Sequence, residues 1–326
     1  MTRIVAIQMD PIETIDIEAD STFALALEAQ RRGFVLHHYL PGDLSWRQGR
    51  IIAHAHPLKV RREKGAHYEK RPGETLDLAN VDVVLMRQDP PFDLAYITAT
   101  HILEQLAPST LVVNDPVAVR NAPEKLYATH FAEWMPPTLI SRRKEEIRAF
   151  REEYGDIIVK PLYGNGGAGV FHLRPEDENL NALLDLFFDI YREPLMVQRY
   201  VPEVKKGDKR IIFVEGEPVG AINRVPPPGE ARSNLHVGGR AEPAELTGRD
   251  REICAALGPS LREAGLLFVG IDVIGHYLTE INVTSPTGIQ EISRFDETDI
   301  AARVWDAIEA RLEAKRPASR PPSQTN

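Results

Sequence analysis

Carboxylate and carboxamide side chains stand close together near the end of the chain, in the segment TEINVTSPTG at residues 279–288. Polar and apolar residues alternate at its start, which predicts a strand with Glu280 and Asn282 on the same face. Asp272 lies after FVG in the strand predicted just before it. If the two strands are neighbours, three oxygen donors converge, and such donors suit Mg²⁺ completed by water and phosphate. The alternative is a half-exposed strand whose polar face lies in water.

A glycine-rich segment, VKPLYGNGGAGV at residues 159–170, contains the spacing G-x-G-x-x-G at Gly164, Gly166 and Gly169. A dinucleotide-binding turn needs a helix after these glycines, and here the strand-like VFHL follows. A Walker A loop is excluded as well, because no Gly-Lys-Ser or Gly-Lys-Thr ends the segment. The remaining interpretation is a glycine-rich hairpin whose N–H groups close over phosphates, with Lys160 just before it. A plain glycine turn is the alternative.

The segment MVQRYVPE, residues 196–203, predicts a strand that ends in a short polar link. A hinge of this kind between two lobes can offer backbone groups to the edge of an adenine base. Glu203, at the end of the link, could then bind the ribose hydroxyls of the same nucleotide.

Basic side chains complete the set of candidate site residues. Arg210, Arg224 and Arg232 lie in or near a long loop rich in proline and glycine, residues 225–240, and Lys125 lies upstream in NAPEKLY. In an acidic protein such a cluster predicts a pocket for carboxylates or for a phosphoryl group in transfer, although each arginine alone is more simply a surface charge. Phosphate clamps, metal ligands and a covering loop are what phosphoryl transfer requires, because its catalysis rests on positioning and charge neutralisation.

Composition excludes several other classes of protein. The 326 residues carry a net charge of −9, so nothing global indicates a nucleic acid or an anionic membrane surface as partner. Cys254 is the only cysteine, which excludes a disulfide within the chain, and its apolar helical stripe predicts a buried residue. We expect His54 and His56, in AHAH, to be solvated loop residues. Because no 18-residue apolar run and no signal-peptide pattern occur, we expect a cytoplasmic protein.

The elements that must position these residues follow from the apolar pattern. Short strands at 3–9, 34–40, 81–87 and 110–114 alternate with helices at 20–34 and 100–107, which predicts a parallel α/β sheet over residues 1–120. Ser21 is the expected N-cap of the first helix and Gly33 its end. Later elements are strands at 156–160, 169–173 and 194–200, a helix near 178–190, a hairpin at 210–225 turning at 215–217, a helix at 247–265 with a Thr247–Asp250 capping box, and strands at 266–275 and 277–283.

Polar clusters follow the ends of the first strands, at Asp10, at Arg87 to Asp89 and at Asn114 to Asp115. Ligands of open α/β sheets bind beyond the carboxyl ends of the strands, so these clusters are candidates to face a site. Ordinary strand-to-loop polarity explains any single one of them equally well.

A strand with a lysine, a glycine-rich hairpin, a hinge strand and then D…E-x-N on the last strands is the order found in ATP-grasp ligases. More specifically, the chain resembles the bacterial glutathione synthetases from about residue 1 to residue 313. The similarity is carried by MDPIETI, LEAQRRG, LMRQDPPFD, EKLYAT, VKPLYGNGGAG, GDKRI, GGRAEP and FVGIDVIGHYLTEINVTSPTGIQEI. DPPFD followed by TEINVTSPTG is highly specific, whereas the glycine-rich segment alone would fit many ligases.

The resemblance implies an α/β protein with an ATP-grasp fold behind an N-terminal parallel α/β domain. The expected parts are an N-terminal substrate-binding domain at 1–122, a first ATP-grasp lobe with the glycine-rich loop at 123–200, a second lobe with the metal ligands and a lid at 225–240 within 201–313, and a disordered tail at 314–326. The implied reaction converts ATP, γ-glutamylcysteine and glycine to glutathione, ADP and phosphate. The cysteinyl carboxylate is phosphorylated first, and the lid shields the acylphosphate from water until the amine of glycine attacks it.

Roles for individual residues follow from the same resemblance. Asp272, Glu280 and Asn282 would bind Mg²⁺, with Mn²⁺ as a substitute. Arg210 would stabilise the transferring phosphoryl group, while Arg224 and Arg232 would hold substrate carboxylates. The nucleotide would be bound by Lys125, Lys160, Gly164, Gly166, Gly167, Gln198, Arg199, Tyr200, Val201, Glu203 and Asp208.

Tyr163 departs from the pattern, because the family often has an acidic residue at this position before the glycine-rich loop. The partners implied by the resemblance are small molecules, with no nucleic acid and no membrane, and a homo-oligomer, expected to be a tetramer. Three other functions stay open: an ATP-grasp ligase that joins other amino acids or a protein C-terminus, a nucleotide-binding regulatory protein without chemistry, and a kinase that stops at phosphorylation.

Overall fold

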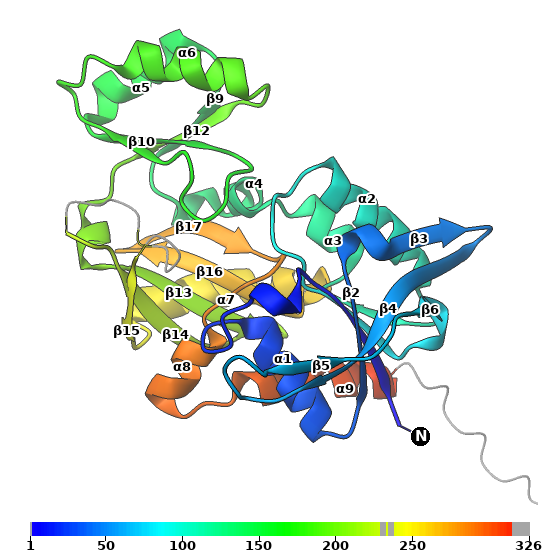
Figure 1. Cartoon of the computed structure of the whole chain (residues 1–326). Coiled ribbons are helices and arrows are strands. Elements are labelled where there is room, and N and C mark those ends of the chain that lie inside the picture. Colours follow the sequence, from blue (N-terminus) through cyan, green and yellow to red (C-terminus); the bar gives the residue numbers. More distant parts are fainter. Residues whose placement is uncertain (1, 229–232, 234–237, 315–326) are drawn as a thin grey trace, which may run out of the picture.

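The computed structural model describes residues 2–228, 233 and 238–314. Within these residues the strands form three sheets, at positions 4–113, 138–199 and 208–282. Figure 1 shows the second sheet with helices α5 and α6 in a small lobe that stands above the rest of the molecule. The first and third sheets lie side by side below it. No helix in the described part of the chain is long and apolar enough to span a membrane.

The N-terminal region is built on a sheet with the strand order β3-β4-β2-β1-β7-β8. Its centre confirms the predicted parallel arrangement, because β1 pairs in parallel with β2 and β7, and β7 with β8. The strands are β1 (Ile4–Gln8), β2 (Val35–Tyr39), β3 (Leu44–Arg47), β4 (Arg50–Val60), β5 (Tyr68–Lys70), β6 (Glu74–Asp77), β7 (Val83–Met86) and β8 (Leu111–Val113). The helices are α1 (Ser21–Arg31), α2 (Leu94–Leu103), α3 (Pro116–Asn121) and α4 (Glu124–Ala128), which leads into the small lobe.

An antiparallel extension of this sheet, β3 to β6, was absent from the sequence prediction. His54 and His56 lie on its long strand β4, where they pair with residues of β6 and β2, so their placement in a loop was wrong. Buried and exposed residues alternate along β4, which is the ordinary pattern of a strand with one face in water. The N-cap of α1 also differs from the prediction, because the side chain of Asp20 and not Ser21 accepts the N–H of Phe23.

The small lobe holds an antiparallel sheet in the order β11-β10-β12-β9. Its elements are β9 (Thr138–Ser141), α5 (Lys144–Tyr154), β10 (Ile157–Pro161), β11 (Phe171–Leu173), α6 (Leu180–Ile190) and β12 (Leu195–Arg199). The pairing of β10 with β11 confirms that the glycine-rich segment connects a hairpin. Apolar residues of both helices and of one face of the sheet form a separate core, which includes Ile147, Val159, Leu184 and Phe187.

The large lobe holds an antiparallel sheet in the order β15-β14-β13-β16-β17. Its elements are β13 (Asp208–Val214), β14 (Glu217–Val225), β15 (Arg240–Pro243), α7 (Gly248–Glu263), β16 (Phe268–Ile274), β17 (Tyr277–Asn282), α8 (Ile289–Asp296) and α9 (Ile300–Ala314). Positive φ angles at Glu215 and Gly216 confirm the predicted hairpin turn. The Thr247–Asp250 capping box is present, and Cys254 is buried on α7, where burial raises the pKa of its thiol to about 12.

Short 3-10 helices connect several of these elements. They span Ile12–Thr14, Pro41–Asp43, Leu78–Asn80, Glu104–Leu106, Thr129–Trp134 and Pro202–Lys206. The last of them follows the predicted hinge, so the chain passes from the small lobe to the large lobe through a compact turn.

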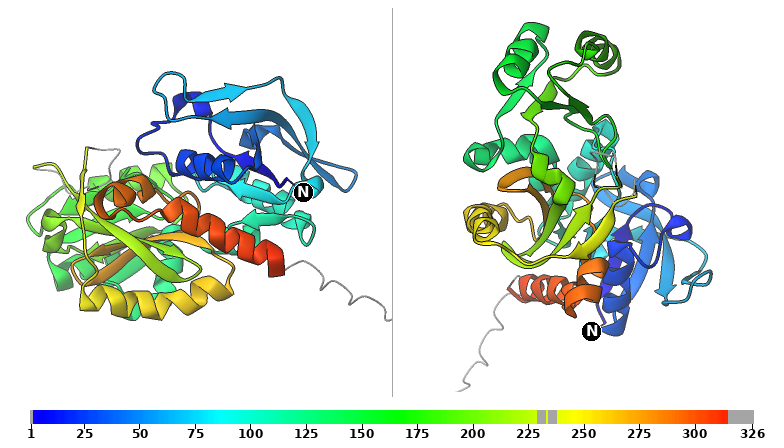
Figure 2. Two further views of the ribbon diagram at one scale, coloured as in Figure 1. Left: turned by 90° about the horizontal axis from the view of Figure 1, so that it is seen from below. Right: turned by 90° about the vertical axis from the view of Figure 1, so that its left-hand side faces the viewer.

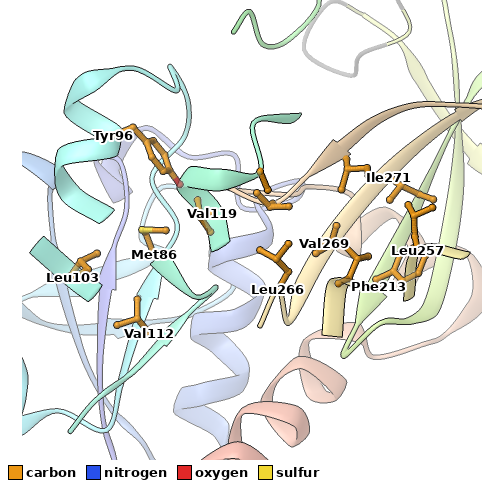
Figure 3. Packing of buried hydrophobic residues seen from close by; sticks show 14 of the residues in the cluster. Met86, Tyr96, Leu103, Val112, Val119, Phe213, Leu257, Leu266, Val269 and Ile271 are labelled. Atoms are coloured by element: carbon orange, nitrogen blue, oxygen red, sulfur yellow. The ribbon is translucent and has the colours of Figure 1, made fainter. Parts of the chain in front are cut away.

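The N-terminal region and the large lobe share their apolar core. Figure 3 shows Met86 and Leu103 of the first sheet region on one side of this core and Phe213 and Ile271 of the third sheet on the other. Elsewhere α9 packs against α1, as Figure 2 shows. The indole N–H of Trp305 on α9 donates to the carbonyl oxygen of Leu25 on α1 at 2.8 Å. The domain boundaries stay a prediction. Helix α9, which begins within the range predicted for the second lobe, packs on the N-terminal region.

Polar side chains fasten the same two regions together near the ends of β7 and β8. The carboxamide of Asn114 accepts the N–H of Phe268 and donates to the carbonyl oxygens of Phe268 and Val283, at 2.7 to 2.8 Å. The buried guanidinium of Arg87 donates to the hydroxyl of Thr22 and to the carbonyl oxygen of Pro286. These contacts fix the segment that follows β17 against the N-terminal sheet.

Candidate active site

A cavity of about 230 Å³ lies where the three sheets meet. The small lobe contributes the end of β10, the glycine-rich loop and the hinge, and the large lobe contributes β13, β14, β16, β17 and the turn after β17. The N-terminal region contributes Asp89, from the polar cluster predicted at the end of β7. Of the predicted site residues, the cavity is lined by Lys125, Lys160, Gly164, Gly166, Gly167, Gln198, Arg199, Tyr200, Val201, Asp208, Arg210, Arg224, Asp272, Glu280 and Asn282.

The three predicted metal ligands face one another across neighbouring strands. In the antiparallel register of β16 and β17, Asp272 lies opposite Glu280, and Asn282 lies opposite Gly270. The carboxamide nitrogen of Asn282 donates to Oδ2 of Asp272 at 3.3 Å. The expectation that the two strands are neighbours is therefore confirmed, and three oxygen-bearing side chains lie together at the cavity wall.

This donor set fits a hard divalent cation that is shared with phosphate. The described residues contain no group of three or more His, Cys, Asp or Glu side chains able to hold a metal ion by themselves. Two carboxylates and a carboxamide leave several ligand positions to water and to phosphate oxygens, which is the usual arrangement for Mg²⁺ in phosphoryl-transfer sites. The assignment of Asp272, Glu280 and Asn282 as ligands stays a prediction.

Two buried arginines surround Asp272. Arg210 binds both carboxylate oxygens of Asp272, with Nε 2.5 Å from Oδ1 and Nη2 3.0 Å from Oδ2, and Arg224 approaches Oδ1 at 2.9 Å. Burial raises the pKa of the Asp272 carboxyl, but the two guanidiniums outweigh burial and lower that pKa to about 2. Gly270 leaves room for this pairing, because a Cβ there would lie 3.0 Å from Cδ of Arg210.

Lys125 and Lys160 meet at Glu280 from different elements. Each ammonium lies 3.4 Å from Oε1 of Glu280, Lys125 from α4 and Lys160 from β10. Burial raises the pKa of Glu280, and the two ammoniums outweigh it and lower that pKa overall. Both lysines are almost fully buried, at 3% and 5% exposure, so their charges act in a medium where they are weakly screened. This placement suits the neutralisation of phosphate groups next to a metal ion.

Glu124 is a site residue that the sequence prediction missed. Its carboxylate pairs with the ammonium of Lys125 and lines the cavity. Burial raises the pKa of Glu124 to about 7, against the opposing effect of Lys125. The residue stands beside Lys125 in the quoted segment NAPEKLY, so adjacency to a predicted phosphate ligand was the available signal.

The glycine-rich loop reaches the cavity as predicted. Its backbone carries positive φ angles at Gly166, Gly167 and Gly169, which are conformations that favour glycine. The carbonyl oxygen of Gly164 accepts the ammonium of Lys125 at 2.7 Å. A Cβ at Gly164 would lie 2.8 Å from Cγ of Pro161, so the first glycine is needed for close packing as well as for flexibility.

The hinge lines the cavity with Gln198, Arg199, Tyr200 and Val201. Together with Ile158, Val170 and Ile274, these residues give that end of the cavity an apolar floor and a row of backbone groups, which is suitable for a flat heterocycle. Glu203 lies apart from them: it is exposed and outside the cavity lining, with its stem close to Gly275. Its assignment to the ribose stays a prediction.

Of the remaining predicted site residues, the structure describes Asp208 but not Arg232. Asp208 is buried and accepts from Nη2 of Arg224 at 2.6 Å and from the hydroxyl of Ser233 at 2.9 Å. Burial raises the pKa of the Asp208 carboxyl, and the Arg224 guanidinium opposes that effect. Arg232 and half of the predicted lid, 225–240, lie outside the described residues, as do all but the first residue of the predicted tail.

The turn TSPTG after β17 is a further part of the site that was not assigned from sequence. Residues 284–288 line the cavity, and the carbonyl oxygen of Thr287 accepts from Nη1 of Arg210 at 3.4 Å. The backbone groups that this turn presents could not be deduced from its side-chain types.

Comparison with protein families identifies the family of this chain. Residues 4–120 match the N-terminal domain of prokaryotic glutathione synthetase, and residues 124–297 match its ATP-grasp domain. The chain belongs to the prokaryotic glutathione synthetase family. It is therefore an enzyme, an ATP-dependent ligase of glutathione synthesis, and the expectation drawn from its sequence motifs is confirmed.

Named relatives cover almost the whole chain. A glutathione synthetase of Mesorhizobium japonicum is 61% identical over 94% of this chain and 98% of its own length. A glutathione synthetase of Vibrio vulnificus is 46% identical over 95% of this chain and 98% of its own length.

Solved structures of other ATP-grasp enzymes share the fold at low identity. A D-cycloserine synthetase superposes with a TM-score of 0.67 at 18% identity, covering 95% of this chain and 99% of its own. A D-alanyl-alanine synthetase A of Vibrio cholerae gives a TM-score of 0.60 at 14% identity, covering 96% and 98%. These likenesses support the ATP-grasp architecture and carry no argument about substrate.

Proposed function

We propose that this ligase joins the cysteinyl carboxylate of γ-glutamylcysteine to the amine of glycine, with conversion of ATP to ADP and phosphate. The observation that carries the proposal is the convergence at Glu280, where Lys125 and Lys160 meet a carboxylate that faces Asp272 and its two arginines. Such a site neutralises the phosphates of ATP and the carboxylate that attacks them, and it holds both in one place.

The chemistry proceeds in two steps on this arrangement. In the first, a carboxylate oxygen of γ-glutamylcysteine attacks the γ-phosphorus of ATP, the bond from that phosphorus to the β–γ bridging oxygen breaks, and ADP leaves. In the second, the amine of glycine attacks the carbonyl carbon of the acylphosphate, phosphate leaves, and the amine loses a proton. We assign Arg210 to the transferring phosphoryl group. Asp272 binds Nε and Nη2 of Arg210 and orients the guanidinium, while Nη1, which donates to the carbonyl oxygen of Thr287 at 3.4 Å, has a second N–H that can bind a phosphate oxygen.

The remaining donors of Arg224, with those of Arg232, are assigned to substrate carboxylates. Arg224 uses Nη2 to bind Asp208 and Asp272, and we assign its Nη1 to the substrate. The hinge backbone takes the adenine base, and the glycine-rich loop covers the phosphates. Asp272, Glu280 and Asn282 hold a divalent cation when it is bound, proposed to be Mg²⁺ with Mn²⁺ as a substitute, and the cation polarises the phosphate oxygens.

Further parts of the proposal rest on the family and on composition. We propose that the enzyme works in the cytoplasm on small-molecule substrates, and that it assembles as a homotetramer. The segment 225–240 is proposed to act as the cover that keeps water from the acylphosphate. The chain is divided, on this proposal, into a substrate domain at 1–122 and two ATP-grasp lobes at 123–200 and 201–313.

Phosphate release is the assay that tests the proposed reaction. The enzyme is supplied with ATP and Mg²⁺ and with γ-glutamylcysteine and glycine together, and each amino-acid substrate is then omitted in turn. Net turnover that requires both substrates, with glutathione as the product, is the expected result. Phosphate release that continues when γ-glutamylcysteine and glycine are both omitted contradicts the substrate assignment, and so does the absence of phosphate release in every combination. Either result leaves an ATP-grasp ligase of other specificity.

A further inference from the structure

Tyr163 stacks on an aromatic ring from another part of the chain. Its ring lies 6.3 Å from the ring of Phe92, and the two planes are within 10° of parallel. Tyr163 immediately precedes Gly164, and Phe92 lies in the segment DPPFD that follows β7. The contact therefore joins the glycine-rich loop of the small lobe to the N-terminal region.

Phe92 is the fixed half of this pair. Its ring packs on the buried ring of Tyr96 at 5.3 Å, and the next residue, Asp93, caps α2 by accepting the N–H of Tyr96 at 3.0 Å. The ring also packs against the core shared by the N-terminal region and the large lobe. A side chain held by a helix cap and a core contact offers a stable platform for a second ring.

Tyr163 belongs to the more loosely held half. The loop after it contains two turn hydrogen bonds of its own, from Ala168 to Asn165 and from Val170 to Gly167. Its first glycine is also held from outside by the ammonium of Lys125. The many glycines give the loop backbone many accessible conformations. Each contact that restricts the loop therefore helps to hold it in the conformation seen here.

We propose that Tyr163 and Phe92 form a positioning pair that holds the glycine-rich loop over the nucleotide phosphates and ties it to the segment bearing Asp89. This inference rests on the proposed function, because it assigns the loop to ATP. Asp89 lines the cavity only three residues before Phe92. The stack thus connects the loop that covers the nucleotide with a segment that reaches the site from the N-terminal region.

The strength of the contact sets the size of the expected effect. Parallel and tilted aromatic pairs contribute about a 2- to 12-fold change in an equilibrium constant beyond the area they bury. Loss of the Tyr163 ring should therefore weaken nucleotide binding by about that factor. An enzyme without this ring should also form some ADP without forming glutathione, because a glycine-rich loop that is held less firmly admits water to the acylphosphate.

Two measurements on full-length enzyme test the pair: the dissociation constant for a non-hydrolysable ATP analogue with Mg²⁺, and the number of ADP molecules formed per glutathione. Tyr163→Ala is expected to weaken analogue binding about 2- to 12-fold and to raise the ratio above one, whereas Tyr163→Phe keeps both at wild-type values. Phe295→Ala is the matched control, since Phe295 on α8 is 41% exposed and Tyr163 is 39% exposed. The thermal midpoint of each variant is recorded to detect unfolding.

A double-mutant cycle separates a shared contact from two independent effects. Phe92→Ala is expected to reproduce the effect of Tyr163→Ala, and the double variant to be no worse than either single one. Wild-type analogue binding in Tyr163→Ala, or effects of the two variants that multiply in the double variant, would overturn the proposal. If the wild-type enzyme makes no glutathione, the proposed reaction fails, while the analogue-binding measurements still decide whether the pair positions the loop.

Discussion

Arg210 and Asp272 form a two-pronged ion pair across β13 and β16, in which two guanidinium nitrogens meet two carboxylate oxygens at 2.5 and 3.0 Å. The pair orients a fork of donors toward the cavity and keeps Asp272 ionised beside the proposed metal. For the role proposed for Arg210, the planar geometry of its guanidinium is therefore more important than its positive charge alone.

Arg210→Lys keeps the positive charge and removes the fork. We expect turnover to fall by about 100-fold, the usual cost of losing one donor that stabilises charge in a transition state, with a smaller change in the KM for ATP. Steady-state glutathione formation gives both constants. Arg262→Lys, an exposed arginine that binds the carbonyl oxygen of Glu215, is the control and should be close to wild type. Equal activity of the two variants would contradict the role of Arg210.

Glu280→Gln removes the carboxylate shared by Lys125 and Lys160. We expect the apparent affinity for the activating metal to fall by about 10- to 100-fold, the range measured when residues that hold or orient metal ligands are changed. The dependence of turnover on Mg²⁺ concentration measures this affinity, and calorimetric metal titration in the presence of ADP confirms it without catalysis. Glu217→Gln, an exposed carboxylate on β14, serves as the control. A loss of stability that matched the loss of turnover would remove Glu280 from the metal site.

Asp272→Asn tests stability against pH. The native pKa of Asp272 is about 2 and its ordinary value is 3.8, so the ionised carboxylate stabilises the fold fully above about pH 4 and this contribution is lost as the pH falls toward 2. We therefore expect the difference in unfolding free energy between wild type and variant to be constant near neutral pH and to shrink below about pH 4. Urea unfolding at a series of pH values measures it. A difference that grows on acidification would have the wrong sign for a depressed carboxyl pKa.

Asn114→Ala should act on stability and on the position of β17. The change leaves the N–H and C=O of Phe268 and the C=O of Val283 without their side-chain partner in a buried place. A cost of about 3 kcal/mol in unfolding free energy is expected, because each buried polar group that loses its partner costs about 1 to 3 kcal/mol. Asn181→Ala on the exposed face of α6 is the comparison, and similar unfolding midpoints for the two variants would show that the Asn114 contacts are not needed.

Much of the site could be predicted because its chemistry depends on residue type and short spacing. Glu280 and Asn282 share a face by the period of a strand, and the lysine before a glycine-rich hairpin is recognisable from order alone. The hairpin turn at Glu215 and Gly216 and the capping box on α7 were equally local signals. In each case the determining interaction lies within a few residues of the motif.

What could not be predicted depends on contacts between distant segments. The partners of Asn114 lie 154 and 169 residues away, and the ring under Tyr163 comes from a different region of the chain. The strand β4 was mistaken for a loop because its polar histidines occupy the exposed face of an antiparallel extension that the expected parallel sheet does not contain. Glu203 shows the limit of proximity in sequence, since it follows the hinge directly but is not among the residues that line the cavity, and its assignment to the ribose stays a prediction.

The separate core of the small lobe bears on where a substitution takes effect. Ile147, Val159, Leu184 and Phe187 pack among themselves, while the proposed metal ligands lie on strands fastened to the N-terminal region by Asn114 and Arg87. Residues 138–199 therefore carry an apolar core of their own, so a substitution inside that core should disturb the small lobe more than the strands that bear Asp272, Glu280 and Asn282. Met196 of β12 reaches the core shared by the N-terminal region and the large lobe, and Lys160 of β10 reaches Glu280, so the small lobe is tied to the rest of the molecule at these points.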